Sequence, residues 1–239
     1  LLAFCLCTGA TAQTAAKTSA TPSPKTAPAV VTPAPGDVLI PAPSDAQVLF
    51  DGKDLAQWCR KDGSPAAWTV ENGDMVVKAK SGNIQTKRNF GDCQLHIEWC
   101  TPENVSDTGQ LRSNSGVFLQ SLYEVQILDS YLNDTYWNGQ AGSIYKQSAP
   151  LVNACQKPGK WNTYDIIYTA PRFKDDGTLH SHGRITVLHN GVLIQNNTLI
   201  LGTTEFIGFP KTVAHGRGPI VLQDHLNPVR FRNIWIREL

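Results

Sequence analysis

Short segments in which polar and apolar residues alternate place the strongest limit on how this chain folds. In residues 94–99 every second side chain is apolar, and in residues 123–127 a Glu and a Gln alternate with apolar residues. A period of two puts alternate side chains on opposite faces of a β-strand. No segment keeps the 3.6-residue apolar spacing of a helix over several turns. We therefore expect a chain built of strands, with helix limited to a turn or two near residues 52–58.

Turn residues divide these segments at short intervals. Asn-Gly at 72–73 and again at 190–191 lies between two apolar runs, which is the pattern of a β-hairpin. Many short strands with Gly and Pro turns indicate an all-β fold, a two-sheet antiparallel β-sandwich or jelly roll. Strands are expected at residues 68–71, 75–77, 94–99, 116–120, 123–127, 164–168, 184–188, 192–194, 220–223 and 231–236.

The same alternation predicts the core between the two sheets. One face of each strand must be buried, and a shift of one residue would exchange the two faces. The expected core residues are Leu95, Ile97, Trp99, Val125, Ile127, either Ile220 or Leu222, and either Ile234 or Trp235. The opposite, polar sides of these strands are expected to lie together on one sheet face, which is either a ligand site or an ordinary solvated surface. This face carries Glu98, Glu124, Gln126, Gln223 and His225.

The first 43 residues differ from the rest of the chain. Residues 1–9 are apolar and are followed by Ala-Thr-Ala, so we expect residues 1–12 to be the end of a secretory signal peptide and the protein to be secreted or periplasmic. A lipoprotein signal would use Cys5 or Cys7, but the large residue before each fits such a signal less well.

A proline-rich stretch follows the expected signal peptide. Residues 13–43 contain 7 Ala, 5 Thr and 7 Pro, which predicts an extended linker that buries little and whose deletion leaves the melting temperature almost unchanged. Residues 44–239 are then the folded domain, long enough for one sizeable core.

The balance of charges excludes a nucleic-acid partner for this domain, and the length of its apolar runs excludes a membrane span. Of 21 Lys and Arg and 20 Asp and Glu residues, only Lys17, Lys25 and Asp37 precede residue 44, so the domain carries 19 positive and 19 negative charges. A nucleic-acid binder needs a basic surplus to neutralise phosphates, so we expect no nucleic-acid partner. The sequence contains no run of 18 apolar residues, so we expect no membrane span.

Four cysteines lie in the domain. Cys93 and Cys100 fall at the two ends of one expected strand, ~23 Å apart and too far for a disulfide. Any bridge would therefore join each of them to Cys59 or Cys155, and free buried thiols are the alternative.

The common catalytic fingerprints are absent. The sequence contains no Gly-x-Ser-x-Gly, His-Glu-x-x-His, P-loop or dinucleotide-binding motif. Aromatic residues crowd into a Gly- and Asn-rich stretch at residues 131–145 and suit the packing of sugar rings, unless they only cover one end of the sandwich.

Several motifs together resemble the 3-keto-disaccharide hydrolase domain family, and the likeness extends over residues 49–239. The resemblance implies a concanavalin-A-like jelly roll and cleavage of glycosides that are oxidised to a ketone at C3. One departure is Leu226, where Gly is expected. The motifs are residues 49–58, 114–120, 123–130, 144–145, 159–162, 188–191, 218–225 and 231–234.

The implied reaction needs three groups. A ketone at C3 acidifies the proton on C2; a base removes it, the enolate expels the C1 substituent, and water can add back. This calls for a base near C2, positive charge near O3 and an acid for the leaving oxygen. Glu124 or His225 is the expected base, and Arg112 or Lys146 the expected positive charge. The expected substrate-binding residues are Glu98, Gln120, Gln126, Asp129, Tyr131, Trp137, Tyr145, His215 and Gln223.

Other functions stay open at this point. No cofactor is required, although a divalent metal ion held by acidic residues (Glu98, Glu124, Asp129, Asp224) and a His could replace the cationic side chains. The expected partner is a glycoside or oligosaccharide. A carbohydrate-binding module without activity is the main alternative, because the same fold serves lectins, and an inhibitory or scaffold sandwich is a third.

Overall fold

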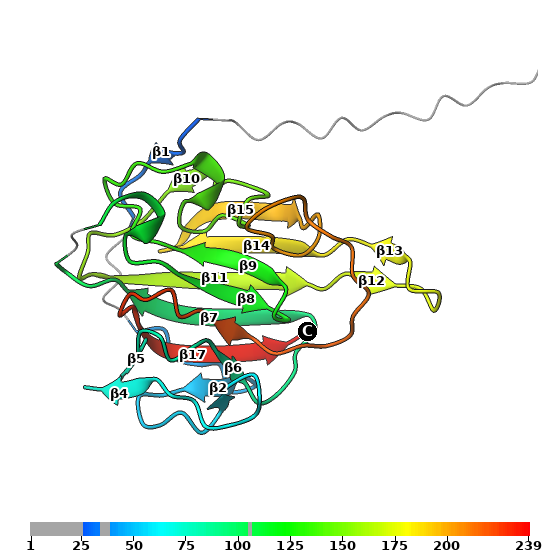
Figure 1. Cartoon of the computed structure of the whole chain (residues 1–239), viewed down its shortest axis with the longest axis horizontal. Helices are drawn as coiled ribbons and strands as arrows, with labels where there is room; N and C mark the ends of the chain where they lie inside the picture. The colour runs from blue at the N-terminus through cyan, green and yellow to red at the C-terminus, as the bar shows by residue number, and fades with distance from the viewer. Residues whose placement is uncertain (1–25, 34–38, 105–106) are drawn as a thin grey trace, which may run out of the picture.

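The computed structural model describes residues 26–33, 39–104 and 107–239, which form two antiparallel sheets packed face to face (Figure 1). The larger sheet contains β2 (Gln47–Phe50), β4 (Thr69–Glu71), β5 (Asp74–Val76), β7 (Cys93–Cys100), β11 (Trp161–Thr169), β14 (Arg184–His189), β15 (Val192–Leu199) and β17 (Arg230–Glu238). The strand order is β15-β14-β11-β7-β17-β5-β4, and β2 also pairs with β17.

The smaller sheet lies across the larger one, and Figure 1 shows two of its strands in front of β7 and β11. It contains β3 (Trp58–Cys59), β6 (Ile84–Thr86), β8 (Ser115–Leu119), β9 (Tyr123–Ile127) and β16 (Val221–Leu222), in the order β3-β6-β16-β8-β9. Two further pairs are β1 (Ala29–Val30) with β10 (Val152–Asn153), and β12 (Arg172–Phe173) with β13 (Leu179–Ser181).

The all-β prediction is confirmed, and each expected strand is present with small shifts at its ends. The helical turn expected near residues 52–58 is wrong: these residues form turns that lead into β3. Within the described ranges, helix occurs only as the 3₁₀ turns η1 (Gly109–Leu111) and η2 (Trp137–Gly139).

The core predicted from alternation is confirmed. Apolar side chains from the inner faces of both sheets meet in one cluster, and the hydroxyl of Tyr164 on β11 reaches across it to donate to the carbonyl of Gln126 on β9 at 2.8 Å. The expected residues found in the cluster are Leu95, Ile97, Trp99, Val125, Ile127, Ile220, Leu222 and Ile234.

A bulge in β17 decides between the two alternatives left open there. Asn233 has φ of +47°, and the pairing with β7 shifts register just before Trp235. The extra residue lets both Phe231 and Ile234 face the core. Trp235 lies on the outer face, where its ring stacks on His96 with 5.0 Å between centroids.

The outer face of the large sheet holds a buried ionic network. Oε2 of Glu98 accepts a hydrogen bond from Nε of Arg232 at 2.6 Å, and Oε1 accepts one from Nδ2 of Asn233 at 2.7 Å. Nδ1 of His96 lies 2.7 Å from Oδ1 of Asp165. Burial alone would raise the pKa of Glu98, but the groups bonded to it hold that pKa below its ordinary value. The polar face of β7 is therefore structural.

The cysteines of the domain are free and buried. Cys93 and Cys100 lie at the two ends of β7, as expected. Burial raises the pKa of Cys93 and that of Cys155 to about 12, so the reactive thiolate form is scarce. Of the two alternatives, the structure shows free thiols.

Part of the expected linker packs on the domain. The signal-peptide expectation for residues 1–12 lies outside the described residues. Strand β1 pairs in parallel with β10, and the amide of Val31 donates to the carbonyl of Asn153 at 3.0 Å. The carbonyl of Ile40 accepts from Nδ2 of Asn233 at 2.8 Å. These positions are tied to the domain by hydrogen bonds and by Val31, which packs against the core, although Val30 and Ile40 stay 70% and 41% exposed. Within the described part of the chain, no helix is long and apolar enough to cross a membrane.

Removing this docked segment should lower the thermal stability. We compare the chain that begins at residue 26 with the chain that begins at residue 42. The shorter chain lacks β1 and the bond at Ile40, and a few hydrogen bonds contribute ~0.5–1.5 kcal/mol each. Its Tm in scanning calorimetry is expected to be about 4–8 °C lower. Equal Tm values would show that the docking contributes nothing to stability.

Candidate active site

A cleft of about 430 Å³ lies on the outer face of the five-stranded sheet. Strands β8 and β9 contribute its floor, and segments on either side of them contribute its walls. This volume falls in the usual range of small-molecule sites. The residues that line the cleft are Gln110, Leu111, Asn114, Phe118, Glu124, Gln126, Tyr145, Thr204, Phe206, Gln223 and His225.

Glu124 reaches the cleft because of the alternation in β9. Val125 and Ile127 face the core, so Glu124 and Gln126 face outward, which confirms the predicted register of this strand. Gly116 on β8 pairs with Gln126. A Cβ on Gly116 would lie only 2.4 Å from Oε1 of Glu124. The missing side chain therefore makes room for the carboxyl group.

The carboxyl group of Glu124 is buried without a partner. The residue is 4% exposed, and within the described part of the chain its side chain makes no hydrogen bond or ion pair. Burial raises the pKa of Glu124 to about 8. A carboxyl group with such a pKa takes up and releases a proton near neutral pH, which is what general acid–base chemistry requires.

Two flanking segments bury this group by bonding to the edge of β9. The amide of Glu124 donates to Oγ1 of Thr204 at 2.9 Å, and its carbonyl accepts from the amide of Tyr145 at 3.1 Å. Phe206 follows Thr204 into the cleft wall. The sheet edge that would otherwise be open to water is therefore covered.

Amide side chains offer hydrogen-bond acceptors along the cleft. Nε2 of Gln126 donates to Oε1 of Gln110 at 2.9 Å, and Nε2 of Gln110 donates to the carbonyl of Gly139 at 2.9 Å. Oε1 of Gln126 and Oε1 of Gln223 are buried and have no partner among the described residues. Because buried polar atoms are normally bonded, these two oxygens are suited to accept hydroxyl groups of a ligand.

Tyr145 lines the cleft, and Tyr136 and Lys146 lie behind it. The hydroxyl oxygens of Tyr136 and Tyr145 lie 2.5 Å apart. Burial raises the pKa of Tyr145, so its hydroxyl keeps its proton. Nζ of Lys146 lies 4.6 Å from the ring centroid of Tyr136 and 5.1 Å from that of Phe206. Lys146 therefore places positive charge on the aromatic wall rather than in the lining.

His225 lines the cleft on the turn that follows β16. Its ring is partly exposed and makes no hydrogen bond with any described residue. The next residue, Leu226, has φ of +69°, a left-handed conformation that favours Gly and costs a larger residue ~1–2 kcal/mol. Leu226 stands where the family resemblance implies Gly, and it adopts the left-handed backbone conformation that Gly would adopt there. Backbone strain therefore lies next to His225.

Other predicted site residues lie elsewhere. Glu98 belongs to the larger sheet, so the expectation that it shares a face with Glu124 is wrong. The amide of Gln120 has structural partners: its Nε2 donates to the carbonyl of Phe90 at 3.2 Å, and its Oε1 accepts from the hydroxyl of Tyr168 at 2.7 Å.

Two pairings engage further predicted residues outside the cleft. Nε of Arg112 donates to Oδ2 of the buried Asp129 at 2.7 Å. Nε2 of His215 lies 2.6 Å from the hydroxyl oxygen of Tyr123. The structure therefore brings together Glu124 and His225 but not Arg112. The lining also excludes Tyr131 and Trp137.

Sequence reasoning missed about half of the lining. Asn114 and Phe118 belong to a motif that carries the family resemblance, so the sequence did contain a clue that these two residues belong to the site. Nothing in the sequence indicates that Thr204 and Phe206 fold back onto β9, because that contact joins segments some 80 residues apart. The missed residues are Gln110, Leu111, Asn114, Phe118, Thr204 and Phe206.

The acidic residues considered for a divalent ion are not assembled. Across residues 26–33, 39–104 and 107–239, no three His, Cys, Asp or Glu side chains gather as a metal-binding group.

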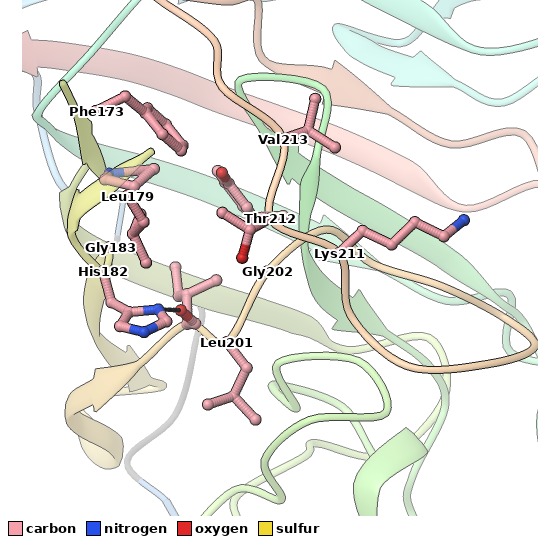
Figure 2. Close-up of a pocket in the computed structure, with 12 residues that line it drawn as sticks. Phe173, Leu179, His182, Gly183, Leu201, Gly202, Lys211, Thr212 and Val213 are labelled. Carbon is pink, nitrogen blue, oxygen red and sulfur yellow. Dashed lines mark hydrogen bonds between the residues drawn. The ribbon is translucent and has the colours of Figure 1, made fainter. Parts of the chain in front are cut away.

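A much smaller hollow lies between the β12–β13 hairpin and residues 200–213 (Figure 2). Phe173, Leu179 and Leu201 line it, and Nδ1 of His182 lies 3.1 Å from the carbonyl oxygen of Ile200. Its volume is about 10 Å³, which is enough for a water molecule and too small for a sugar ring.

Comparison with known proteins identifies the family. The model of the "3-keto-alpha-glucoside-1,2-lyase-like domain" matches residues 45–237. A crystal structure from Parabacteroides distasonis, described as a "putative glycosyl hydrolase", is 57% identical, covers 90% of this chain and 93% of its own, and superposes with a TM-score of 0.82. A second one from that organism, 21% identical over 82% of this chain and 94% of its own with a TM-score of 0.58, shares the fold. No curated protein matches the chain. The chain belongs to the 3-keto-alpha-glucoside-1,2-lyase-like domain family, and this membership together with the glycosyl hydrolase likeness supports a glycoside-acting enzyme of the hydrolase or lyase type.

Proposed function

We propose that the protein cleaves glycosides that carry a ketone at C3, by elimination across C1 and C2. The observation that carries this proposal is the carboxyl group of Glu124, buried without a partner on the floor of the cleft. Family membership supports the substrate class. The unpartnered amide oxygens of Gln126 and Gln223 suit the hydroxyl groups of a sugar ring.

Glu124 acts as the base in this scheme. Its carboxylate takes the proton from C2, which the neighbouring ketone has made acidic. The electron pair of the C2–H bond moves first toward O3 as an enolate and then forms the C1–C2 double bond as the C1–O bond breaks. The leaving oxygen needs a proton, and His225 is the group in the lining with a free ring to supply it. Water adding across the double bond would complete a net hydrolysis.

The hydroxyl of Tyr145 is suited to stabilise the enolate. It and Tyr136 share a single hydrogen bond, so when Tyr136 donates, the O–H of Tyr145 is free to point into the cleft. Positive charge on Lys146 lies behind the same wall. A hydrogen-bond donor that points at the developing negative charge, in a site with little water, makes a large contribution to the rate.

A binding-only role fits the cleft less well. Burying an ionisable group without a partner costs stability, and sites that carry out chemistry commonly accept that cost. A lectin site would need sugar contacts but no unpaired carboxyl group with a pKa of about 8.

Glu124→Gln is the direct test of the base. The variant keeps the shape but loses the charge, so its kcat on methyl 3-keto-α-glucoside is expected to fall at least ~10²-fold. Because the carboxylate of Glu124 is the active form, wild-type kcat/KM is expected to rise with pH toward about 8, and to fall again where the group that protonates the leaving oxygen has lost its proton. Glu103→Gln, at an exposed position, is the matched control. If Glu124→Gln keeps full turnover, Glu124 is not the base. If the wild type binds sugars but cleaves neither oxidised nor ordinary glycosides, the protein is a lectin.

The same variant should be more stable than the wild type at alkaline pH. The folded pKa of Glu124, about 8, exceeds the ordinary value of 4.5. The wild type therefore loses stability as pH rises from about 4.5 through 8, whereas Gln does not titrate. We expect the difference in Tm between Glu124→Gln and the wild type to widen in favour of the variant between pH 4.5 and pH 9. A constant difference across this range would mean that the carboxyl group is not held in a desolvated site.

Gly116→Ala tests the positioning of the carboxyl group. The added methyl group would meet Oε1 of Glu124 at 2.4 Å, so the carboxyl group must move. A shift of about 1 Å in a catalytic group costs on the order of 10²-fold in rate, and we expect a loss of that size in kcat with little change in circular dichroism. An unchanged kcat would show that the position of the Glu124 carboxyl group beside Gly116 does not matter for the reaction.

A further inference from the structure

An open hollow of about 400 Å³ lies where β3 ends and β6 begins. Strand β3 is at one edge of the five-stranded sheet, and β9, which carries Glu124, is at the other. Among the described residues, none lines both this hollow and the cleft. The turn at residues 60–62 and the loop at residues 81–83 form its lining. The hollow is therefore a separate feature of the surface, and the chemistry proposed for Glu124 does not involve it.

Hydrogen-bond donors dominate the lining of this hollow. Nε of Arg60 and Oγ of Ser81 are buried and have no partner among the described residues. Oδ1 of Asn83 accepts from the amide of Asp224 at 2.9 Å, so the side-chain nitrogen of Asn83 is left to donate. Lys61 adds an ammonium group that forms no ion pair with any described residue. Because buried polar atoms are normally bonded, this set of groups is suited to an acceptor from outside the chain.

The carboxylates near the hollow are bonded to other groups. Asp62 lines it, but its Oδ1 accepts from the amide of Ser64 at 3.0 Å and from the hydroxyl of Ser64 at 2.6 Å. These bonds hold the pKa of Asp62 below its ordinary value. Oδ2 of Asp224 accepts from the amide of Gly82 at 2.9 Å. Neither carboxylate therefore neutralises the basic side chains through an ion pair.

Positive charge exceeds negative charge in the two segments that form the hollow. Residues 60–64 and 78–83 contain four basic residues and one acidic residue. None of the four basic side chains forms an ion pair with a described residue. Unpaired charges of one sign raise the local concentration of ions of the opposite sign. The four basic residues are Arg60, Lys61, Lys78 and Lys80.

Backbone bonds fix the donors in place. The amide of Ser81 donates to the carbonyl of Lys78 at 3.1 Å, and Nε1 of Trp68 donates to the carbonyl of Gly82 at 3.0 Å. On the other side of the hollow, the amide of Arg60 donates to the carbonyl of Ser64 at 2.8 Å. Groups held in this way lose little conformational freedom when a ligand binds, so more of the interaction free energy appears as affinity.

We propose that this hollow is an oxyanion-binding site. Its ligand is a sulfate, phosphate or carboxylate group, carried by an acidic saccharide or present as the free inorganic ion. The guanidinium group of Arg60 is planar and can bind two oxygens of such a group at once. The ammonium group of Lys61, the hydroxyl of Ser81 and the side-chain nitrogen of Asn83 supply further donors to the remaining oxygens.

Isothermal titration calorimetry tests the site, with ionic strength held constant by sodium chloride. We expect sodium sulfate to bind saturably, with one ion per chain. The Kd should rise at least ~10-fold in Arg60→Gln, because a hydrogen bond to a charged group contributes about one factor of ten or more. Lys61→Gln, at an exposed position, is the second variant and should also raise the Kd. Lys174→Gln, an exposed lysine on the β12–β13 hairpin, is the control and should leave the Kd unchanged.

Titration with glucose 6-sulfate distinguishes the two sources of the oxyanion. If it binds more tightly than sulfate and both variants weaken it, the ligand is an acidic saccharide. If it binds no more tightly than sulfate, the ligand is the inorganic ion. Neutral glucose is the control for binding in the cleft, and its heat should be the same in the wild type and in Arg60→Gln.

Two results would overturn the oxyanion site. One is that neither sulfate nor glucose 6-sulfate binds saturably to the wild type. The other is that Arg60→Gln and Lys61→Gln, shown to be folded by circular dichroism, bind both probes as the wild type does. Neither result bears on the cleft, because the rate with methyl 3-keto-α-glucoside is expected to stay within about twofold in both variants.

Discussion

Burial of one face of every strand against the opposite sheet is the constraint on which the rest of this structure depends. Trp99 and Ile97 on β7 meet Val125 and Ile127 on β9 in a single apolar cluster. With a side-chain period of two, this contact fixes which residues face outward. Glu124 lies in the cleft because its neighbours are needed in the core, and a shift of one residue would place the carboxyl group between the sheets.

Packing alone would leave the outward side chains of β9 in water, and the flanking segments change that. All five residues of the strand are buried, because residues 144–145 and 204 bond along its free edge and the cleft walls rise on both sides. The carboxyl group of Glu124 thus loses its water without gaining a partner. Its altered acidity follows from the fold of distant loops rather than from any charged neighbour.

Local patterns in the sequence predicted the strands, the core and the outward position of Glu124, because each depends on neighbours along one segment. They did not predict which sheet each strand joins, so Glu98 and Glu124 were expected on one face although they lie on opposite sides of the sandwich. The bulge at Asn233 broke the simple alternation of β17 and moved Trp235 outward. Contacts between distant segments, such as Thr204 on β9, carry no local signal, and for that reason Thr204 and Phe206 were missed.

The position of β17 in the large sheet affects how the chain reaches its native state. It lies beside β7, yet β7 ends at residue 100 and β17 begins at residue 230, so the two strands pair only after the 129 intervening residues have been brought back. Contacts of such high sequence separation slow folding. Until then one edge of β7 lacks its partner, and this proline-free, β-prone strand is an open template for pairing with other chains. Yield of the folded protein should thus depend more on chain concentration and temperature during folding than on the stability of the finished sandwich.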